Sequence, residues 1–229
     1  MCTVVFWDID GTLLTSAGAG ILAWEEALHD VYGVVGADLS DLQSRGLTDG
    51  QIAVLLAESH GSGADTESAA PSLLKAYERR LPGSLRQRPG HVLPGVVEIL
   101  EDFARRRDVS CLLLTGNTAT GARTKLEYFR LAHYFPGDGA FCIGLDAREE
   151  IALRAHGLAA EFCSEFVSSE RMYVVGDTPE DVRCGQVIGA RVIAISSGIY
   201  SPQELAASNP WIVLESLPAP RQFAELVEI

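Results

Sequence analysis

The chain has 229 residues, a formal net charge of −13 and a hydrophobic content of 47%. That length and hydrophobicity allow one large domain or a core that carries a substantial insertion. Because an acidic surface repels nucleic-acid backbones and anionic membranes, neither is expected as a partner. The five cysteines are dispersed, and the N-terminus lacks the basic start of a signal peptide. We therefore expect no disulfide framework and a cytoplasmic location.

Short apolar runs alternate with helical patterns along most of the chain. The expected strands are Thr3–Trp7, Ser110–Leu114, Ala140–Ile143, Met172–Val175, Arg191–Ile195 and a last candidate, Trp211–Leu214. The expected helices are Gly95–Arg107, Thr118–Leu131, Arg148–Ser168, Pro179–Ile188 and Pro220–Val227. This alternation predicts an α/β fold in which helices cover both faces of a doubly wound parallel sheet.

One interval does not fit this alternation. The stretch between Trp7 and Ser110 is much longer than the roughly 30 residues of a strand–helix–strand unit. Apolar residues recur at helical spacing over Ala17–Leu81, which predicts a small helical bundle, and the Pro- and Gly-rich residues that follow predict a return linker. We expect an α/β core over residues 1–15 and 90–229, with a helical cap and its linkers over residues 16–89.

Polar residues follow three of the expected strands. Asp8-Ile9-Asp10-Gly11-Thr12 follows the first strand, Thr115-Gly116-Asn117 the second, and Gly176-Asp177-Thr178-Pro179-Glu180-Asp181 the fourth. Open parallel sheets bind ligands beyond the carboxyl ends of their strands, so these residues are expected to gather in one pocket. Lys125 lies on the helix after Asn117 and is one of only two lysines in the chain.

The expected pocket is strongly acidic. It is expected to hold four carboxylates and only one positive charge, that of Lys125. The carboxylates are those of Asp8, Asp10, Asp177 and Asp181. Buried carboxylates that share a site raise one another's pKa values unless a cation is present. Mg²⁺ suits such a site because it binds one or two carboxylates, several waters and a substrate phosphate oxygen.

The same residues provide donors for a phosphoryl group. Thr115, the Gly116 amide and Lys125 are expected to hold it, and a phosphate at the start of the Thr118 helix would meet free backbone N–H groups. Ordinary structural roles compete with these assignments. Thr118 suits a helix N-cap, Lys125 suits a solvated helix face, and Asp181 suits the first turn of a capped helix. The joint occurrence at strand ends, in this order, favours the functional interpretation.

In these motifs the chain resembles the haloacid dehalogenase superfamily on its phosphatase side. The resemblance rests on Asp8-Ile9-Asp10-Gly11-Thr12, on Leu112-Leu113-Leu114-Thr115-Gly116-Asn117, on Lys125 and on Gly176–Val182. The segment Ala122–Glu127 and the helical insertion resemble the phosphoglycolate phosphatase-like branch. The resemblance covers essentially the whole chain.

The resemblance implies a mechanism with an aspartyl-phosphate intermediate. Asp8 would be the nucleophile and Asp10 the general acid and base. Mg²⁺ would bind Asp8, the backbone carbonyl of Asp10 and Asp177, whereas Asp181 would bind it through water or support Lys125. Thr115 and Lys125 would hold the transferring group, with Gly11, Gly116 and Asn117 also expected at the phosphate.

The resemblance implies a small phosphorylated metabolite as the substrate, a phosphoglycolate-like phosphomonoester, and does not identify it further. Among the cap residues, Arg45 and Thr48 are the better candidates for substrate recognition, because they lie in a break between cap helices. A sugar phosphomutase of the same superfamily is an alternative, and a non-catalytic phosphate-binding regulatory protein is a weaker one. We expect a monomer or a homodimer.

Overall fold

The computed structural model describes residues 2–40, 42, 46–61, 66–135, 139–163 and 167–229. Its main sheet has six parallel strands in the order β5-β4-β1-β6-β7-β8. The strands are β1 (Thr3–Trp7), β4 (Val109–Thr118), β5 (Ala140–Cys142), β6 (Met172–Gly176), β7 (Arg191–Ile195) and β8 (Ile212–Leu214). The predicted α/β fold with a parallel sheet is confirmed, and β1 lies inside the sheet between β4 and β6.

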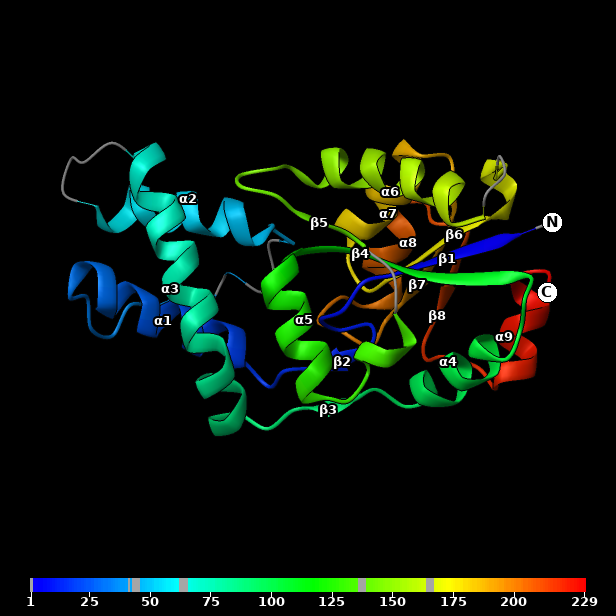
Figure 1. Ribbon diagram of the computed structural model, residues 1–229, viewed down its shortest axis with the longest axis horizontal. Coiled ribbons are helices and arrows are strands. Elements are labelled where there is room, and N and C mark those ends of the chain that lie inside the picture. Colours follow the sequence, from blue (N-terminus) through cyan, green and yellow to red (C-terminus); the bar gives the residue numbers. More distant parts are fainter. Residues whose placement is uncertain (1, 41, 43–45, 62–65, 136–138, 164–166) are drawn as a thin grey trace.

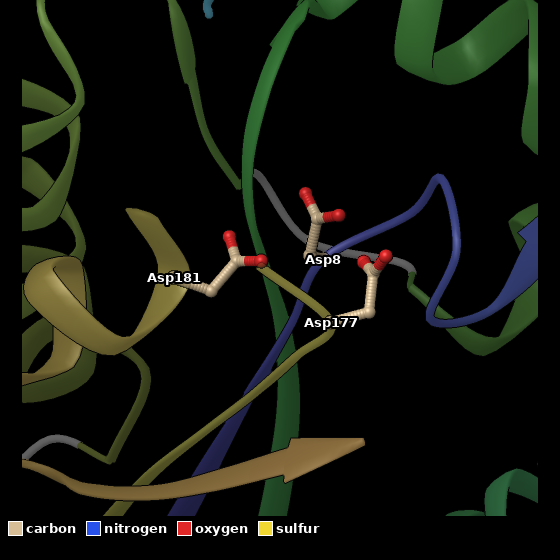
Figure 2. A group of neighbouring side chains, drawn as sticks. All are labelled: Asp8, Asp177 and Asp181. Carbon is tan, nitrogen blue, oxygen red and sulfur yellow. The ribbon is translucent and has the colours of Figure 1, made fainter. Parts of the chain in front are cut away.

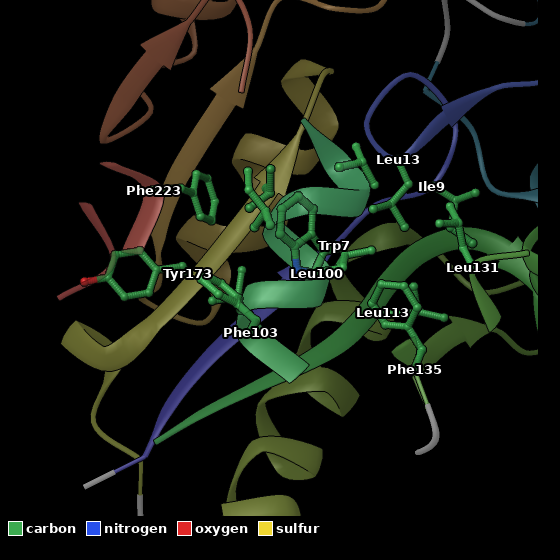
Figure 3. Packing of buried hydrophobic residues seen from close by; sticks show 14 of the residues in the cluster. Trp7, Ile9, Leu13, Leu100, Phe103, Leu113, Leu131, Phe135, Tyr173 and Phe223 are labelled. Atoms are coloured by element: carbon green, nitrogen blue, oxygen red, sulfur yellow. The ribbon is translucent and has the colours of Figure 1, made fainter. Parts of the chain in front are cut away.

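Helices cover both faces of this sheet (Figure 1). One face carries α4 (Val96–Ala104), α5 (Ala119–Tyr128) and α9 (Pro220–Leu226), and the other carries α6 (Arg148–Cys163), α7 (Pro179–Val187) and α8 (Pro202–Ala207). Alternate side chains of β1 enter the two cores, as a strand buried on both faces requires. Trp7 packs in the first core, where its ring stacks on Phe223 with centroids 5.6 Å apart (Figure 3).

The segment after β1 forms a separate helical layer at one end of the sheet (Figure 1). It consists of α1 (Ala19–Tyr32), α2 (Asp49–His60) and α3 (Thr66–Gln87), which share a hydrophobic cluster of their own. Trp24 and Tyr77 stack in this cluster with ring centroids 4.1 Å apart. The short strands β2 (Leu14–Thr15) and β3 (His91–Val92) pair antiparallel where the chain enters and leaves the layer.

Several elements differ from their predicted bounds. Helix α3 runs through Pro82 to Gln87, although Pro82 was expected to begin the return linker. Leu81 and Leu85 are fully buried on either side of that proline, so burial outweighs the hydrogen bond that proline removes. Strand β4 continues to Thr118 instead of ending at Leu114, because Thr118 still pairs with Cys142 of β5. The short helix α8 was not predicted.

No disulfide framework was expected, and one pair of cysteines is nevertheless joined. Cys2 and Cys163 are joined by a disulfide, whereas Cys111, Cys142 and Cys184 are free thiols. Cys2 precedes β1, and the residues after Cys163 lead into β6, which pairs with β1. The topology therefore brings together two cysteines whose separation of 161 residues hides their proximity in the sequence. No helix in the described part of the chain has the length and apolar character needed to cross a membrane.

Candidate active site

Three carboxylates meet at the carboxyl end of the central strands (Figure 2). Asp8 follows β1 and its backbone N–H still donates to the Val175 carbonyl of β6, while Asp177 follows β6 and Asp181 lies in the first turn of α7. Each offers one carboxylate oxygen within 4.8 Å of the other two. All three side chains are buried. Negative charge is concentrated here because β1 and β6 are neighbours in the sheet and their carboxyl ends lie side by side.

Burial and mutual repulsion disfavour ionisation in this cluster. Burial, followed by the charge of Asp181, raises the pKa of Asp8 to about 7. The pKa of Asp177 is also raised well above its ordinary value, by burial and then by Asp181 and Asp8. A bound cation would reverse both effects, so the donor set of hard oxygens with raised pKa values suits a divalent metal ion.

Arg148, at the start of α6, is a site residue that the sequence reasoning missed. Its Nη1 lies 2.6 Å from Asp181 Oδ1 and 3.9 Å from Asp8 Oδ1, and its Nε donates to the Gly46 carbonyl at 3.1 Å. Burial lowers the pKa of Arg148, but Asp181 and Asp8 outweigh burial and raise it. No pattern in the sequence distinguishes this arginine, since only the return of the chain to the sheet edge brings it beside Asp8.

The partners of Asp181 differ from those expected. Asp181 Oδ1 accepts from Arg148, and its Oδ2 accepts from the Thr178 backbone N–H at 3.0 Å and the Thr178 hydroxyl at 2.7 Å. Both oxygens are therefore occupied by a capping box and an ion pair. The idea that Asp181 supports Lys125 is wrong, because the cation beside Asp181 is Arg148.

Asp10 and Lys125 form a second charged group. Lys125 Nζ donates to Asp10 Oδ2 at 2.5 Å and to Asn117 Oδ1 at 2.6 Å, and Asn117 Nδ2 donates to Asp10 Oδ2 at 3.0 Å. Burial raises the pKa of Asp10, but Lys125 outweighs burial and the net pKa is lowered. The Lys125 side chain is only 4% exposed, so it is not a solvated helix residue.

Thr115 lies beside both groups on β4. Its hydroxyl oxygen accepts from Asn117 Nδ2 at 2.9 Å, and a hydrogen bond from Thr115 lowers the pKa of Asp8. Asp8, Asp10, Thr115 and Lys125 are thus brought together at one edge of the sheet. The carboxylate of Asp10 is not a member of the acidic cluster, since it faces Lys125.

Two glycines make room for Asp177. A Cβ atom at Gly198 would lie 1.8 Å from Asp177 Oδ2, and one at Gly11 would lie 2.2 Å from the same oxygen. Gly11 also has a φ of +82°, a conformation that other residues rarely adopt. The Asp-Gly pair in the first motif is therefore needed for the close approach of the backbone to Asp177.

Two of the backbone N–H groups at the start of α5 already have acceptors within the protein. The Thr118 backbone N–H donates to Asp49 Oδ2 at 2.8 Å, and the Gly121 N–H donates to the Thr118 hydroxyl at 3.0 Å. The Thr118 hydroxyl in turn donates to Glu78 Oε1 at 2.6 Å. Cap carboxylates and the N-cap side chain therefore use donors that were expected to meet a phosphate.

The two cap candidates have different outcomes. Thr48 is fully buried as the N-cap of α2, where its hydroxyl accepts from the Gln51 N–H and donates to the Asp146 carbonyl at 2.9 Å. Thr48 does not line the cavity described below, and its contacts are those of a residue that stabilises the start of α2. Arg45 lies outside the described residues.

A cavity of about 360 Å³ lies between the core and the helical layer. Its core end is lined by charged and amide groups: Asp8, Asp10, Asn117, Lys125, Arg148 and Asp177. Gly11 and Gly116 line it as well. This volume lies in the range of small-molecule sites.

Comparison with known proteins identifies the family. Residues 5–186 match the family model of the haloacid dehalogenase-like hydrolases, which is most of the chain. The chain belongs to this family. This match confirms the predicted superfamily, and the phosphatases among the relatives below confirm the predicted enzyme class, a phosphoric monoester hydrolase.

Individual relatives are distant but match along the whole chain. A phosphoglycolate phosphatase of Vibrio parahaemolyticus is 26% identical over 231 residues, covering 99% of this chain and 95% of the relative. One from Pseudomonas savastanoi pv. phaseolicola is 25% identical and covers 93% of this chain and 76% of the relative. A crystal structure of a predicted phosphatase from Clostridium acetobutylicum covers all of both chains with a TM-score of 0.73 at 20% identity, which shows the shared fold.

Proposed function

We propose that this chain is a Mg²⁺-dependent phosphatase that hydrolyses a small phosphorylated metabolite through an aspartyl-phosphate. The observation that carries the proposal is the convergence of Asp8, Asp177 and Lys125 at the end of one cavity. In the proposed reaction Asp8 Oδ attacks phosphorus, and the bond from phosphorus to the alcohol oxygen breaks. Two relatives are named phosphoglycolate phosphatases, so 2-phosphoglycolate belongs in any substrate panel.

Asp10 is proposed to move the protons. In the ground state Lys125 holds its pKa below the ordinary value, so Asp10 is ionised and competent as a base. A bound phosphoryl dianion competes for the Lys125 ammonium, so Asp10 takes up a proton from solvent and gives it to the leaving alcohol oxygen as the bond to phosphorus breaks. It later takes a proton from the water that hydrolyses the aspartyl-phosphate.

The metal ion is proposed to lie between Asp8 and Asp177. The raised pKa values of these two carboxylates fit a cation, and hard oxygen ligands suit Mg²⁺. When bound, Mg²⁺ would neutralise charge on the cluster and orient phosphoryl oxygens. Asp181 is better placed to fix Arg148 than to bind the ion directly, because both of its oxygens already accept hydrogen bonds.

The test is turnover of an aryl phosphate combined with trapping of phosphate on the protein. Excess chelator should abolish turnover, and added Mg²⁺ should restore it. Asp8→Asn should remove the trapped phosphate, whereas Asp10→Asn should slow turnover with Asp8 still the labelled residue. Label on any residue other than Asp8, or full activity in chelator, contradicts the proposal. Product analysis with sugar phosphates separates hydrolysis from the alternative phosphomutase reaction.

A further inference from the structure

The end of the cavity that faces the cap is chemically unlike the end at the core. Its cap lining is mostly apolar, and we call this set the apolar wall: Ile21, Trp24, Leu42, Leu47, Ile52 and Tyr77. Trp24 and Tyr77 are held in place by their stacked rings, and both are almost fully buried. Binding of an apolar leaving group at this end would be favourable, because it would remove apolar surface of both the leaving group and the protein from water.

The cap contributes one charged side chain to the described lining of the cavity, and it is the acidic Asp49. Asp49 comes from the first turn of α2 and is buried. The described cations of α3 lie elsewhere, since Lys75, Arg79 and Arg86 are exposed and Arg80 pairs with Asp30. A second anionic group on a substrate would therefore face a carboxylate, with no cation from the described part of the cap.

We propose that the substrate is a phosphomonoester of an uncharged, largely apolar alcohol. Its phosphoryl group lies among the core residues, and its carbon chain lies against the apolar wall. This inference rests on the proposed phosphatase function and narrows its substrate class. A carboxylate on the leaving group, as in 2-phosphoglycolate, is disfavoured by Asp49.

A panel of alkyl phosphates with the Mg²⁺-loaded enzyme tests the substrate class. From ethyl to butyl phosphate, kcat/KM should rise about fourfold for each methylene that becomes buried. Ethyl phosphate should be a better substrate than 2-phosphoglycolate, which is similar in length but carries a carboxylate. Asp49→Asn keeps an acceptor for the Thr118 N–H and should raise the rate for 2-phosphoglycolate relative to ethyl phosphate roughly five- to tenfold, the size of one screened charge repulsion.

A matched pair of variants on α2 tests the apolar wall. Ile52→Ser should lower the ratio of kcat/KM for butyl phosphate to that for ethyl phosphate. Leu55→Ser is the control, because Leu55 is half-buried on the same helix but does not line this cavity. An equal loss of the ratio in both variants contradicts a direct contact with Ile52.

Binding of unreactive phosphonates separates this inference from the proposed function. Butylphosphonate should change the tryptophan fluorescence and bind more tightly than phosphonoacetate, and Trp24→Phe should remove that signal. Such binding without turnover of any ester would refute the phosphatase function and support the inference. A preference for 2-phosphoglycolate over butyl phosphate overturns the inference, as does a carboxylate preference that Arg45→Gln abolishes.

Discussion

At the scale of single residues, the site is organised by two cations that divide the carboxylates between them. Lys125 holds Asp10, and Arg148 lies between Asp181 and Asp8. The two neighbouring acids have opposite pKa shifts, since Lys125 lowers the pKa of Asp10 against the effect of burial, whereas burial and Asp181 raise the pKa of Asp8 despite Arg148. One acid is thereby kept ionised, and the other depends on a cation to become so.

Removal of the Arg148 charge should destabilise the chain. Arg148→Met keeps most of the side-chain volume but leaves Asp8 and Asp181 without their buried counter-ion, so the free energy of unfolding should fall by about 3–5 kcal/mol. Urea unfolding in chelator measures this, and Mg²⁺ should recover part of the loss. Arg183→Met is the control: Arg183 pairs with Glu180 at the surface, and its loss should cost less than about 1 kcal/mol. Similar losses in the two variants would argue against the role given to Arg148.

The buried carboxylate of Asp49 should make stability depend on pH. Burial raises its pKa from 3.8 to about 6, so between these values the folded chain holds a proton that the unfolded chain has released. Stability from this group therefore falls as the pH rises through that window. Asp49→Asn should match the parent near pH 4 and exceed it at pH 7.5 by up to roughly 2–3 kcal/mol. A difference between the two unfolding curves that does not change with pH contradicts the shift.

The sequence predicted the site residues that directly follow strands, but not those that tertiary packing brings to the site from the starts of helices. Asp8, Asp177 and Thr115 were predictable because parallel strands end at one edge of a sheet. Arg148 and Asp49 begin helices and have no motif, so their approach to Asp8 and Lys125 depends on tertiary packing. For the same reason, Lys125 was wrongly predicted as a partner of Asp181, whose cation is Arg148.

At the scale of elements, α3 shows how burial decides a boundary that local propensity does not. Pro82 and Gly83 are adjacent and read as a linker, yet the helix continues to Gln87. Buried Leu81 and Leu85 hold the last turns of the helix against the cap cluster. A proline in a helix interior costs about 3 kcal/mol, which this packing offsets.

Pro82→Ala should therefore stabilise the chain more than Gly83→Ala. We expect a gain of up to about 3 kcal/mol for the first and about 1 kcal/mol for the second, from helix propensity alone. A Cβ atom at Gly83 meets no atom closer than 4.0 Å, so this control adds no clash. Chemical denaturation measures both. A loss of stability in Pro82→Ala would contradict this interpretation of the boundary.

At the scale of the whole molecule, the α/β core and the helical layer have separate hydrophobic clusters. Their periodic patterns made both predictable from the sequence. Hydrogen bonds join the two parts: the Thr118 backbone N–H donates to Asp49, the Thr118 hydroxyl donates to Glu78, and Arg148 donates to the Gly46 carbonyl. These contacts join groups that are far apart in the chain, which is why no sequence pattern predicted them.

These hydrogen bonds should break at lower cost than apolar contacts when the two parts move apart, because water can replace them. Glu78→Ala removes the acceptor of the Thr118 hydroxyl while leaving that hydroxyl as the N-cap of α5. We expect KM to rise, because binding must then close the cavity without this contact. A lost bond to a charged group corresponds to about 10- to 100-fold in kcat/KM.

The distribution of distances between spin labels on α2 and α6 should broaden in the variant and narrow again with Mg²⁺ and phosphate. Glu58→Ala on the exposed side of α2 is the control and should change neither measurement. Unchanged label distances together with a lower kcat would instead assign Glu78 to the chemistry at Lys125 and not to closure.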